Sequence, residues 1–264
     1  MDSKFVVNVP YANVYNNFQE EEVVSQALMG ETVRVIEEVN NHAKIVLSDS
    51  YQGFLRKDYL LSTTLDGKPI VVIKEPVVNA YRDPSIRSKL IFSLPIGSVL
   101  LDNEFEEGDY RNVSDFAGRS FFVHKNAIFT ARFPFTYKKT NCKEIVRTSL
   151  MFLNVPYLWG GKTSFGFDCS GFVQTVFKLN GYYLLRDAHM QASMDIFEKY
   201  NFGEREILPC DVLFFGKEKI NHVGIYIGHR KFIHATTYNV PKVQISDFSK
   251  YWIDIINVIG RIKW

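Results

Sequence analysis

The chain has 264 residues, of which 46% are hydrophobic and 23% are charged, and its formal net charge is +2. These fractions are ordinary for globular proteins, and a length above the usual single-domain range predicts two or three domains. The small net charge and the lack of a long basic run give nucleic-acid binding no electrostatic support, so we predict no nucleic-acid partner.

The N-terminal segment from Met1 to Pro10 has neither the basic start nor the apolar core of a signal peptide. No stretch of the sequence reaches the apolar length that a membrane span needs. We therefore expect a soluble, cytoplasmic protein with no membrane partner. A chain trimmed of its signal peptide would begin in the same way, so a periplasmic or secreted origin stays open.

The first half of the sequence is β-like. Short runs rich in branched and aromatic residues, separated by turn-forming residues, predict strands at 32–36, 43–47 and 53–55. Three short motifs also recur in the same order: residues 14–15, 30–33 and 51–54 reappear as 80–81, 97–99 and 116–119. Two similar units of this size predict two small β-barrels, residues 1–64 and 65–135, joined by a connector at 62–69.

The pattern changes near residues 134–140, beyond which helices are predicted. Residues 141–153 have helical spacing, with Thr140 or Asn141 as the cap. A glycine-containing loop at 155–161 follows, and a second helix is predicted from about Cys169 to Leu179. From Val212 onward the strand pattern returns, which predicts an α+β catalytic domain over residues 136–264.

Only three cysteines occur in the chain: Cys142, Cys169 and Cys210. Three are too few for a disulfide framework, and an odd number leaves at least one free thiol. No CxxC pair is present, so the sequence does not predict a thiolate zinc site.

Cys169 stands at the predicted start of the second helix. Asp168, directly before it, is a good N-cap, and Ser170 and Gly171 are small residues that keep the backbone near the sulfur open. The unpaired amides and the dipole of a helix N-terminus stabilise a thiolate, and they also suit the oxyanion of an acyl-transfer intermediate. This setting favours a cysteine nucleophile over the small buried hydrophobe that most cysteines are.

Two histidines follow on predicted strands. His222 opens an alternating run, 222–228, whose glycine-containing face leaves space beside the imidazole for a substrate. His234 comes 12 residues later, after a predicted hairpin turn. A regular two-residue loop at 229–230 would place the two histidines on opposite faces, whereas an odd loop or a one-residue bulge places them on the same face. A catalytic pair requires the second geometry.

The other histidines carry less signal. His42, His124 and His229 have no chemical neighbours in sequence, so we expect them on the surface. His189, which follows residues 186–188, is a candidate for lining a cleft. The histidines lack ligand spacing such as HxxxH, and we predict neither a metal site nor a cofactor.

Three motifs and a histidine together resemble the NlpC-type papain-like cysteine peptidases. They are PYLWGG at 156–161, GFDCSGF at 166–172, HVGIYIG at 222–228, and His234. The doubled β-unit in front of them resembles the paired bacterial SH3-like domains of one branch, which contains the γ-D-glutamyl-L-diamino-acid endopeptidases of murein recycling. The resemblance implies a fold of two all-β SH3-like barrels followed by an α+β papain-like domain.

The resemblance also implies the catalytic roles. Cys169 is then the nucleophile, His222 the general base and acid, and His234 the residue that orients His222. Tyr157 is then expected to lean its hydroxyl toward the thiol or the oxyanion.

In the same branch the free α-amine of the substrate is held by the residues on either side of the cysteine, which are Asp168 and Ser170 here. A glutamate and a tyrosine of the first barrel complete this clamp, and the matching candidates are Glu22 and Tyr51. Two carboxylates and hydroxyl groups suit an ammonium taken from water. The choice within the glutamate run stays open between Glu20, Glu21 and Glu22.

The implied reaction is hydrolysis of the γ-D-glutamyl bond in small murein peptides, L-Ala-γ-D-Glu-diamino acid, with release of L-Ala-D-Glu. The sequence does not distinguish diaminopimelate from lysine, and no obligate protein partner is evident. Two alternatives stay open: a papain-like amidase or acyltransferase acting on another amide, and a non-catalytic murein-binding protein. Two positions depart from the family pattern, because Cys210 replaces the usual glycine and Leu185 a frequent proline.

Overall fold

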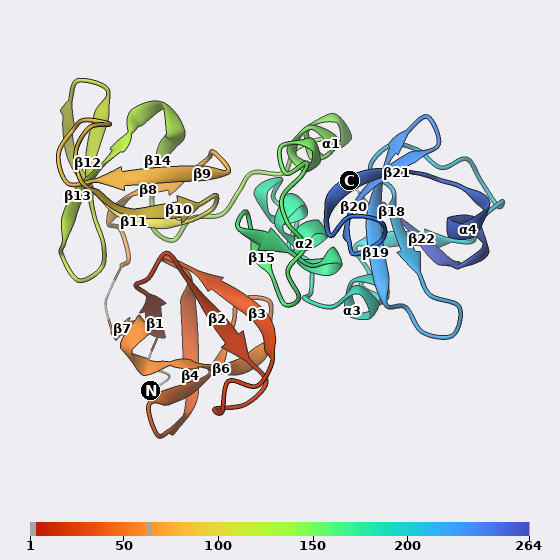
Figure 1. Ribbon diagram of the computed structural model, residues 1–264, viewed down its shortest axis with the longest axis horizontal. Helices are drawn as coiled ribbons and strands as arrows, with labels where there is room; N and C mark the ends of the chain where they lie inside the picture. Colours follow the sequence, from red (N-terminus) through yellow and green to blue (C-terminus); the bar gives the residue numbers. More distant parts are fainter. Residues whose placement is uncertain (1–3, 63–64, 264) are drawn as a thin grey trace. The chain divides into compact units, whose positions relative to one another are not determined.

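The protein is described by a computed structural model that covers residues 4–62 and 65–263 (Figure 1). The chain forms two compact units, Met1–Thr136 and Tyr137–Trp264. The predicted connector at 62–69 and the boundary after residue 64 include residues 63 and 64, which lie outside the described residues.

The N-terminal unit contains two antiparallel seven-stranded sheets. The first has the order β3-β2-β6-β5-β4-β1-β7 and the second the order β10-β9-β13-β12-β11-β8-β14, so the second repeats the topology of the first. The strands of the first sheet are β1 (Lys4–Val7), β2 (Tyr11–Tyr15), β3 (Val23–Leu28), β4 (Thr32–Val39), β5 (His42–Val46), β6 (Gln52–Arg56) and β7 (Leu60–Ser62). Those of the second sheet are β8 (Pro69–Ile73), β9 (Val77–Tyr81), β10 (Leu90–Pro95), β11 (Val99–Glu107), β12 (Tyr110–Ser114), β13 (Ser120–His124) and β14 (Ile128–Arg132). A single 3-10 turn precedes the last strand of each sheet, at Lys57–Tyr59 and at Lys125–Ala127.

The internal repeat seen in the sequence is matched by equivalent contacts in the two sheets. The amide of Gly30 donates to the carbonyl of Val7, and that of Gly97 donates to the carbonyl of Ile73, both at 2.9 Å. Both glycines have positive φ angles, 82° and 84°, which a residue with a side chain rarely adopts. The second motif of the repeat therefore marks the same turn in each copy.

The third motif of the repeat was aligned wrongly from the sequence. Tyr15 pairs with Phe54 in the first sheet, and Tyr81 pairs with Phe122 in the second, so residues 51–54 correspond to 119–122. The error arose because Gly53 was matched with Gly118, although Gly53 lies inside a strand and Gly118 lies in a turn with φ of 84°.

Each sheet encloses its own apolar core. The first core includes Val14, Ile45 and Leu55, which are fully buried. The second core includes Phe121 and also Met29, a residue that follows the third strand of the first sheet. Because Met29 packs into the second core, the two sheets form one compact unit.

The C-terminal unit is an antiparallel six-stranded sheet of order β17-β22-β18-β19-β20-β21, with helices packed on it. The helices are α1 (Cys142–Leu150), α2 (Cys169–Leu179), α3 (Ala188–Ser193) and α4 (Lys250–Asp254). The strands of the sheet are β17 (Phe197–Tyr200), β18 (Val212–Phe215), β19 (His222–Gly228), β20 (Lys231–Thr236), β21 (Lys242–Asp247) and β22 (Ile256–Ile262). A short hairpin of β15 (Lys162–Thr163) and β16 (Gly166–Phe167) precedes α2.

Helix α2 is the element that positions the site. Its predicted bounds are confirmed, with Asp168 as the N-cap and Asn180 as the C-cap. Its side chains are buried along most of its length, including Phe172, Val176 and Phe177, because the helix packs between the β15 hairpin and strands β19 and β20. The first turn of α2 is thereby held against the start of β19.

Helix α1 is shorter than predicted. It begins after the Asn141 cap, as expected, but ends at Leu150 rather than at residue 153. Within residues 4–62 and 65–263, no helix is both long enough and apolar enough to cross a membrane.

Candidate active site

Cys169 is the first residue of α2 and is half-buried. Its sulfur lies 4.0 Å from the carbonyl oxygen of Asn221, the residue directly before His222. The backbone amides of Ser170 and Val223 both hydrogen-bond the sulfur. The thiol therefore sits between the N-terminus of α2 and the start of β19, next to the histidine that was predicted to serve as its base.

The local chain makes this close approach possible. Asp168 caps the helix, since its Oδ1 accepts from the amide of Gly171 at 2.7 Å. Asp168 also donates its own amide to the carbonyl of Gly161, at 3.0 Å. A Cβ on Gly171 would collide with that same carbonyl, so glycine is required where the helix meets the loop.

The two histidines are on the same face and hydrogen-bonded to each other. Nε2 of His222 lies 2.7 Å from Nδ1 of His234, and Nε2 of His234 lies 2.9 Å from Oγ of Ser246. If His222 donates from Nε2 and His234 donates from Nε2, each bond has one donor and one acceptor. This tautomer set leaves the Nδ1 lone pair of His222 free to accept a proton.

The bulge on which this geometry depends is present. Tyr226 pairs with Phe232 but Gly228 pairs with Lys231, so the register shifts by one residue between these pairs. The loop residues His229 and Arg230 have φ angles of 51° and 56°, as in a primed two-residue turn. The sequence condition for a catalytic pair, a bulge that puts both histidines on one face, is therefore confirmed.

The absence of a side chain at Gly224 allows Phe232 and His234 to pack against β19. A Cβ at Gly224 would lie 2.8 Å from the Phe232 ring and 3.1 Å from Cβ of His234. The space beside Gly224 is therefore occupied by Phe232 and His234, and it is not left open for a substrate as the sequence predicted. Trp252 of α4 covers the pair, with its ring stacked on His222 at a centroid separation of 5.6 Å.

Burial keeps the three central groups neutral at rest. It lowers the pKa of His222 to about 4, against a smaller opposing effect of the Asp168 carboxylate. It lowers the pKa of His234 to about 2, helped by the neighbouring His222. Burial also raises the pKa of the Cys169 thiol to about 12, and the Asp168 carboxylate acts in the same direction.

The stabilising effect expected of the helix N-terminus is present, but it does not decide the protonation of Cys169. The amides of Ser170 and Val223 lower the pKa of Cys169, but burial and the charge of Asp168 outweigh them. The free protein holds a thiol beside a neutral imidazole. Proton transfer from sulfur to His222 then belongs to the step in which sulfur attacks the substrate.

Arg186 is a site residue that the sequence reasoning missed. Only 1% of its surface is exposed, and its guanidinium forms a two-pronged ion pair with the Asp168 carboxylate, at 3.1 and 2.5 Å. It also donates to Oγ of Ser170 at 2.9 Å. A buried guanidinium must be paired. Because Arg186 and Asp168 are far apart in the sequence, the sequence did not show that they form this pair.

Ser246 and Trp252 were missed as well, because nothing in their local sequence marks them. Tyr157, by contrast, was predicted, and the structure places it near the thiol. Its side chain is half-buried, and burial together with the Asp168 carboxylate raises the pKa of its hydroxyl. That hydroxyl is therefore protonated at neutral pH and can donate a hydrogen bond.

The predicted clamp residues divide between the two units. Asp168 and Ser170 are buried beside Cys169, and Arg186 donates hydrogen bonds to both side chains. Glu22 and Tyr51 belong to the N-terminal unit, where Glu22 is exposed and accepts from Asn16 at 3.4 Å. Their role in binding stays a prediction.

The neighbouring candidates have closer partners. Glu20 pairs with His42 at 2.7 Å, and Glu21 accepts from Asn17 at 2.6 Å. His189 is exposed on α3, and Cys210 is buried in the turn before β18. Among the described residues, no group of three or more His, Cys, Asp or Glu side chains could hold a metal ion.

Comparison with known proteins places this site in a family. The NlpC/P60 family model matches residues 154–261, and the model of the bacterial dipeptidyl-peptidase Sh3 domain matches residues 14–60. A γ-D-glutamyl-L-lysine dipeptidyl-peptidase of Bacillus subtilis is 32% identical over 233 residues, which are 81% of this chain and 72% of the relative. The chain belongs to the NlpC/P60 family.

Other relatives agree with this assignment. Dipeptidyl-peptidase 6 of Lysinibacillus sphaericus is 27% identical over 225 residues, covering 81% of this chain and 80% of the relative. The crystal structure of an NlpC/P60 family protein from Bacillus cereus has the same fold, with a TM-score of 0.85 at 21% identity. It covers 98% of this chain and 99% of that one. The chain is thus a cysteine peptidase with an N-terminal SH3 domain and an NlpC/P60 domain.

Proposed function

We propose that the protein hydrolyses the γ-D-glutamyl–diamino acid bond of murein stem peptides that carry a free N-terminal L-Ala, and releases L-Ala-D-Glu. The observation that carries the proposal is the Cys169 thiol at the start of α2 beside the hydrogen-bonded pair His222 and His234. The names of two relatives, γ-D-glutamyl-L-lysine dipeptidyl-peptidases of Bacillus subtilis and Bacillus cereus, support the bond that is cut.

In the proposed mechanism, Nδ1 of His222 takes the proton of Cys169 while the sulfur attacks the γ-carbonyl carbon of D-Glu. His234 accepts the Nε2 proton of His222 in a hydrogen bond and so orients the ring, and Ser246 anchors His234 in turn. The amides at the N-terminus of α2 and the protonated Tyr157 hydroxyl are suited to stabilise the oxyanion. His222 then protonates the leaving amine, and water hydrolyses the thioester.

The proposed amine site needs a second carboxylate. The charge of Asp168 is already balanced by Arg186, so Asp168 and Ser170 offer acceptor oxygens but no net negative charge. An ammonium taken from water requires an opposite charge near it. Glu22, with Tyr51 as a further hydroxyl, is the proposed source of that charge.

The test compares L-Ala-γ-D-Glu-L-Lys with its meso-diaminopimelate counterpart and with both N-acetylated peptides, with products identified by mass spectrometry. We expect L-Ala-D-Glu from the free amines and a strongly raised KM for the acetylated ones. Glu22→Ala should raise KM in part, and Cys169→Ala should abolish turnover. Equal cleavage of acetylated peptides would exclude the amine clamp, and turnover by Cys169→Ala would exclude the mechanism.

Two further arms separate the alternatives. Adding an amine acceptor identifies an acyltransferase, because the D-Glu γ-carbonyl would then appear on that amine. Binding to insoluble murein without cleavage of any soluble peptide would identify a binding protein.

We also infer that the second sheet is a second SH3-type domain. Its strand order repeats that of the first sheet, strand by strand, and the turn glycines Gly30 and Gly97 make the same hydrogen bond. The three-domain division at residues 1–64, 65–135 and 136–264 rests on this inference.

A further inference from the structure

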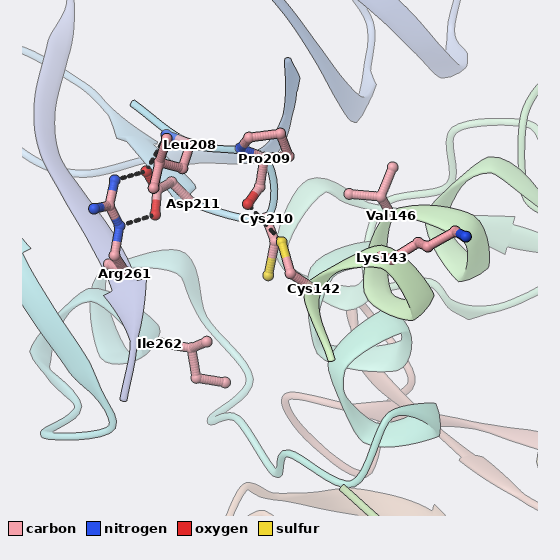
Figure 2. A pocket seen from close by; sticks show the side chains of 9 residues that line it. All are labelled: Cys142, Lys143, Val146, Leu208, Pro209, Cys210, Asp211, Arg261 and Ile262. Carbon is pink, nitrogen blue, oxygen red and sulfur yellow. Dashed lines mark hydrogen bonds and ion pairs between the residues drawn. The ribbon is translucent and has the colours of Figure 1, made fainter. Parts of the chain in front are cut away.

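A second cysteine site lies in the C-terminal unit, outside the residues assigned to the reaction. Cys142 is the first residue of α1, and Cys210 lies in the turn before β18. Figure 2 shows their sulfur atoms side by side, and the two thiols are hydrogen-bonded to each other. Cys142 also donates to the carbonyl of Pro209 at 2.6 Å.

Both residues are held in place by the structure around them. Asn141 caps α1 by accepting from the amide of Glu144, which fixes the backbone at Cys142. The turn at Cys210 is anchored by Asp211, which is 2% exposed and accepts from Arg261 at 2.8 and 2.7 Å. The two sulfurs therefore meet with little further ordering of the chain.

Cys210 has a backbone conformation that favours glycine, so the presence of a side chain at this position calls for an explanation. Its φ angle is 77°, in the left-handed region where a side chain costs energy and glycine does not. A strained side chain at a buried position is a reason to ask what that side chain does. Here the Cys210 side chain brings its thiol into hydrogen-bonding contact with the thiol of Cys142.

The two thiols differ in reactivity. Cys142 is half-buried and borders a cavity of about 580 Å³, whose walls include Val146, Leu208 and Ile262. The hydrogen bond from Cys210 lowers the pKa of Cys142, and the same pairing with burial raises the pKa of Cys210. Cys142 is thus the accessible nucleophile. Cys210 is the buried thiol that can react with a mixed disulfide formed on Cys142.

We propose that Cys142 and Cys210 form a reversible disulfide in exchange with low-molecular-weight disulfides. The Cys142 thiolate attacks one sulfur of the external disulfide, forming a mixed disulfide and releasing one thiolate. Cys210 then attacks the Cys142 sulfur, forming the protein disulfide and releasing the second thiol. The two protein thiols lose two electrons, and the external disulfide is reduced to two thiols, which take up the two protons.

This disulfide would tie the N-terminus of α1 to the turn before β18. The closed loop runs from residue 142 to residue 210, and a long loop restricts the unfolded chain strongly. Oxidation should therefore raise the melting temperature of the C-terminal unit by about 5–15 °C. Cys169 lies within this loop and stays a free thiol.

The test treats the full chain with 2-hydroxyethyl disulfide, alkylates the remaining thiols with iodoacetamide and maps tryptic peptides without reduction. We expect peptides 140–143 and 206–217 to be joined, Cys169 to be alkylated, and the melting temperature to rise reversibly with dithiothreitol. The matched variants are Cys142→Ser and Cys210→Gly, the latter because glycine suits the φ angle. Neither variant should gain stability on oxidation.

Three results would overturn the proposal. The first is a mixed disulfide that persists on Cys142 while Cys210 stays alkylatable. The second is a cross-link from either cysteine to Cys169. The third is an equal rise in melting temperature for the two variants and the wild-type chain, which would place the stabilisation elsewhere.

Discussion

Replacing Arg186 by methionine should destabilise the C-terminal unit severely. The substitution keeps the apolar stem but removes a guanidinium that is 1% exposed and pairs with both oxygens of Asp168. Among the residues that the structure describes, the carboxylate, which is itself buried, would then keep as hydrogen-bond partners the Gly171 amide and Ser170, the latter at 3.3 Å.

Removing one partner of a buried ion pair costs about 3–5 kcal/mol, because the other charge is left without compensation. In a unit of this size, that loss lowers the melting temperature by about 10–15 °C. The exposed pair of Arg147 and Glu144 on α1 offers a matched control, since Arg147→Met should cost less than about 1 kcal/mol.

The assay is urea unfolding followed by tryptophan fluorescence. All three tryptophans, Trp159, Trp252 and Trp264, belong to the C-terminal unit, so the signal reports this unit alone. The double variant Asp168→Asn with Arg186→Met removes both charges and keeps a capping oxygen, so it should recover much of the lost stability. A cost for Arg186→Met no larger than that of Arg147→Met, or a double variant less stable than the single one, would refute the buried-pair account.

Two further predictions concern the histidines. Because burial holds the pKa of His222 at about 4 and that of His234 at about 2, while both are near 6.5 in the unfolded chain, the unfolded state binds more protons below pH 6.5. The free energy of unfolding should be at its full value above pH 6.5 and fall by up to about 1.4 kcal/mol per pH unit per histidine between pH 6 and pH 4.5. Urea midpoints should show a shallower slope for His234→Gln and an unchanged slope for the exposed His189→Gln; equal slopes in all three proteins would contradict the assignment. Ser246→Ala should lower kcat about tenfold with little change in KM, because His234 loses the acceptor that fixes its tautomer, and an unchanged kcat would show that Ser246 does not act through His234.

The local features of the site could be read from the sequence. Asp168 before Cys169 predicts the start of α2, since an Asp side chain satisfies amides that the helix leaves unpaired, and the structure has that cap. The alternation after His222 predicts a strand, and the requirement for a bulge follows from the two-residue period alone. These inferences need only neighbours within a few residues.

The features that the sequence did not reveal depend on residues brought together from far apart. Arg186 lies 18 residues from Asp168, and Ser246 lies 12 residues beyond His234 on another strand. The third motif of the repeat was misaligned because a glycine in a strand and a glycine in a turn look alike until the strand pairs are known.

By itself, the sequence determined where the second helix starts, that Cys169 stands at its first position, and that two histidines follow on strands that a bulge must align. Only the tertiary structure decided the protonation of these groups, because burial sets it and burial is a property of the packed chain. The isolated helix start would favour a thiolate, yet burial in the packed chain raises the pKa of Cys169 to about 12 and keeps the thiol protonated until a substrate arrives.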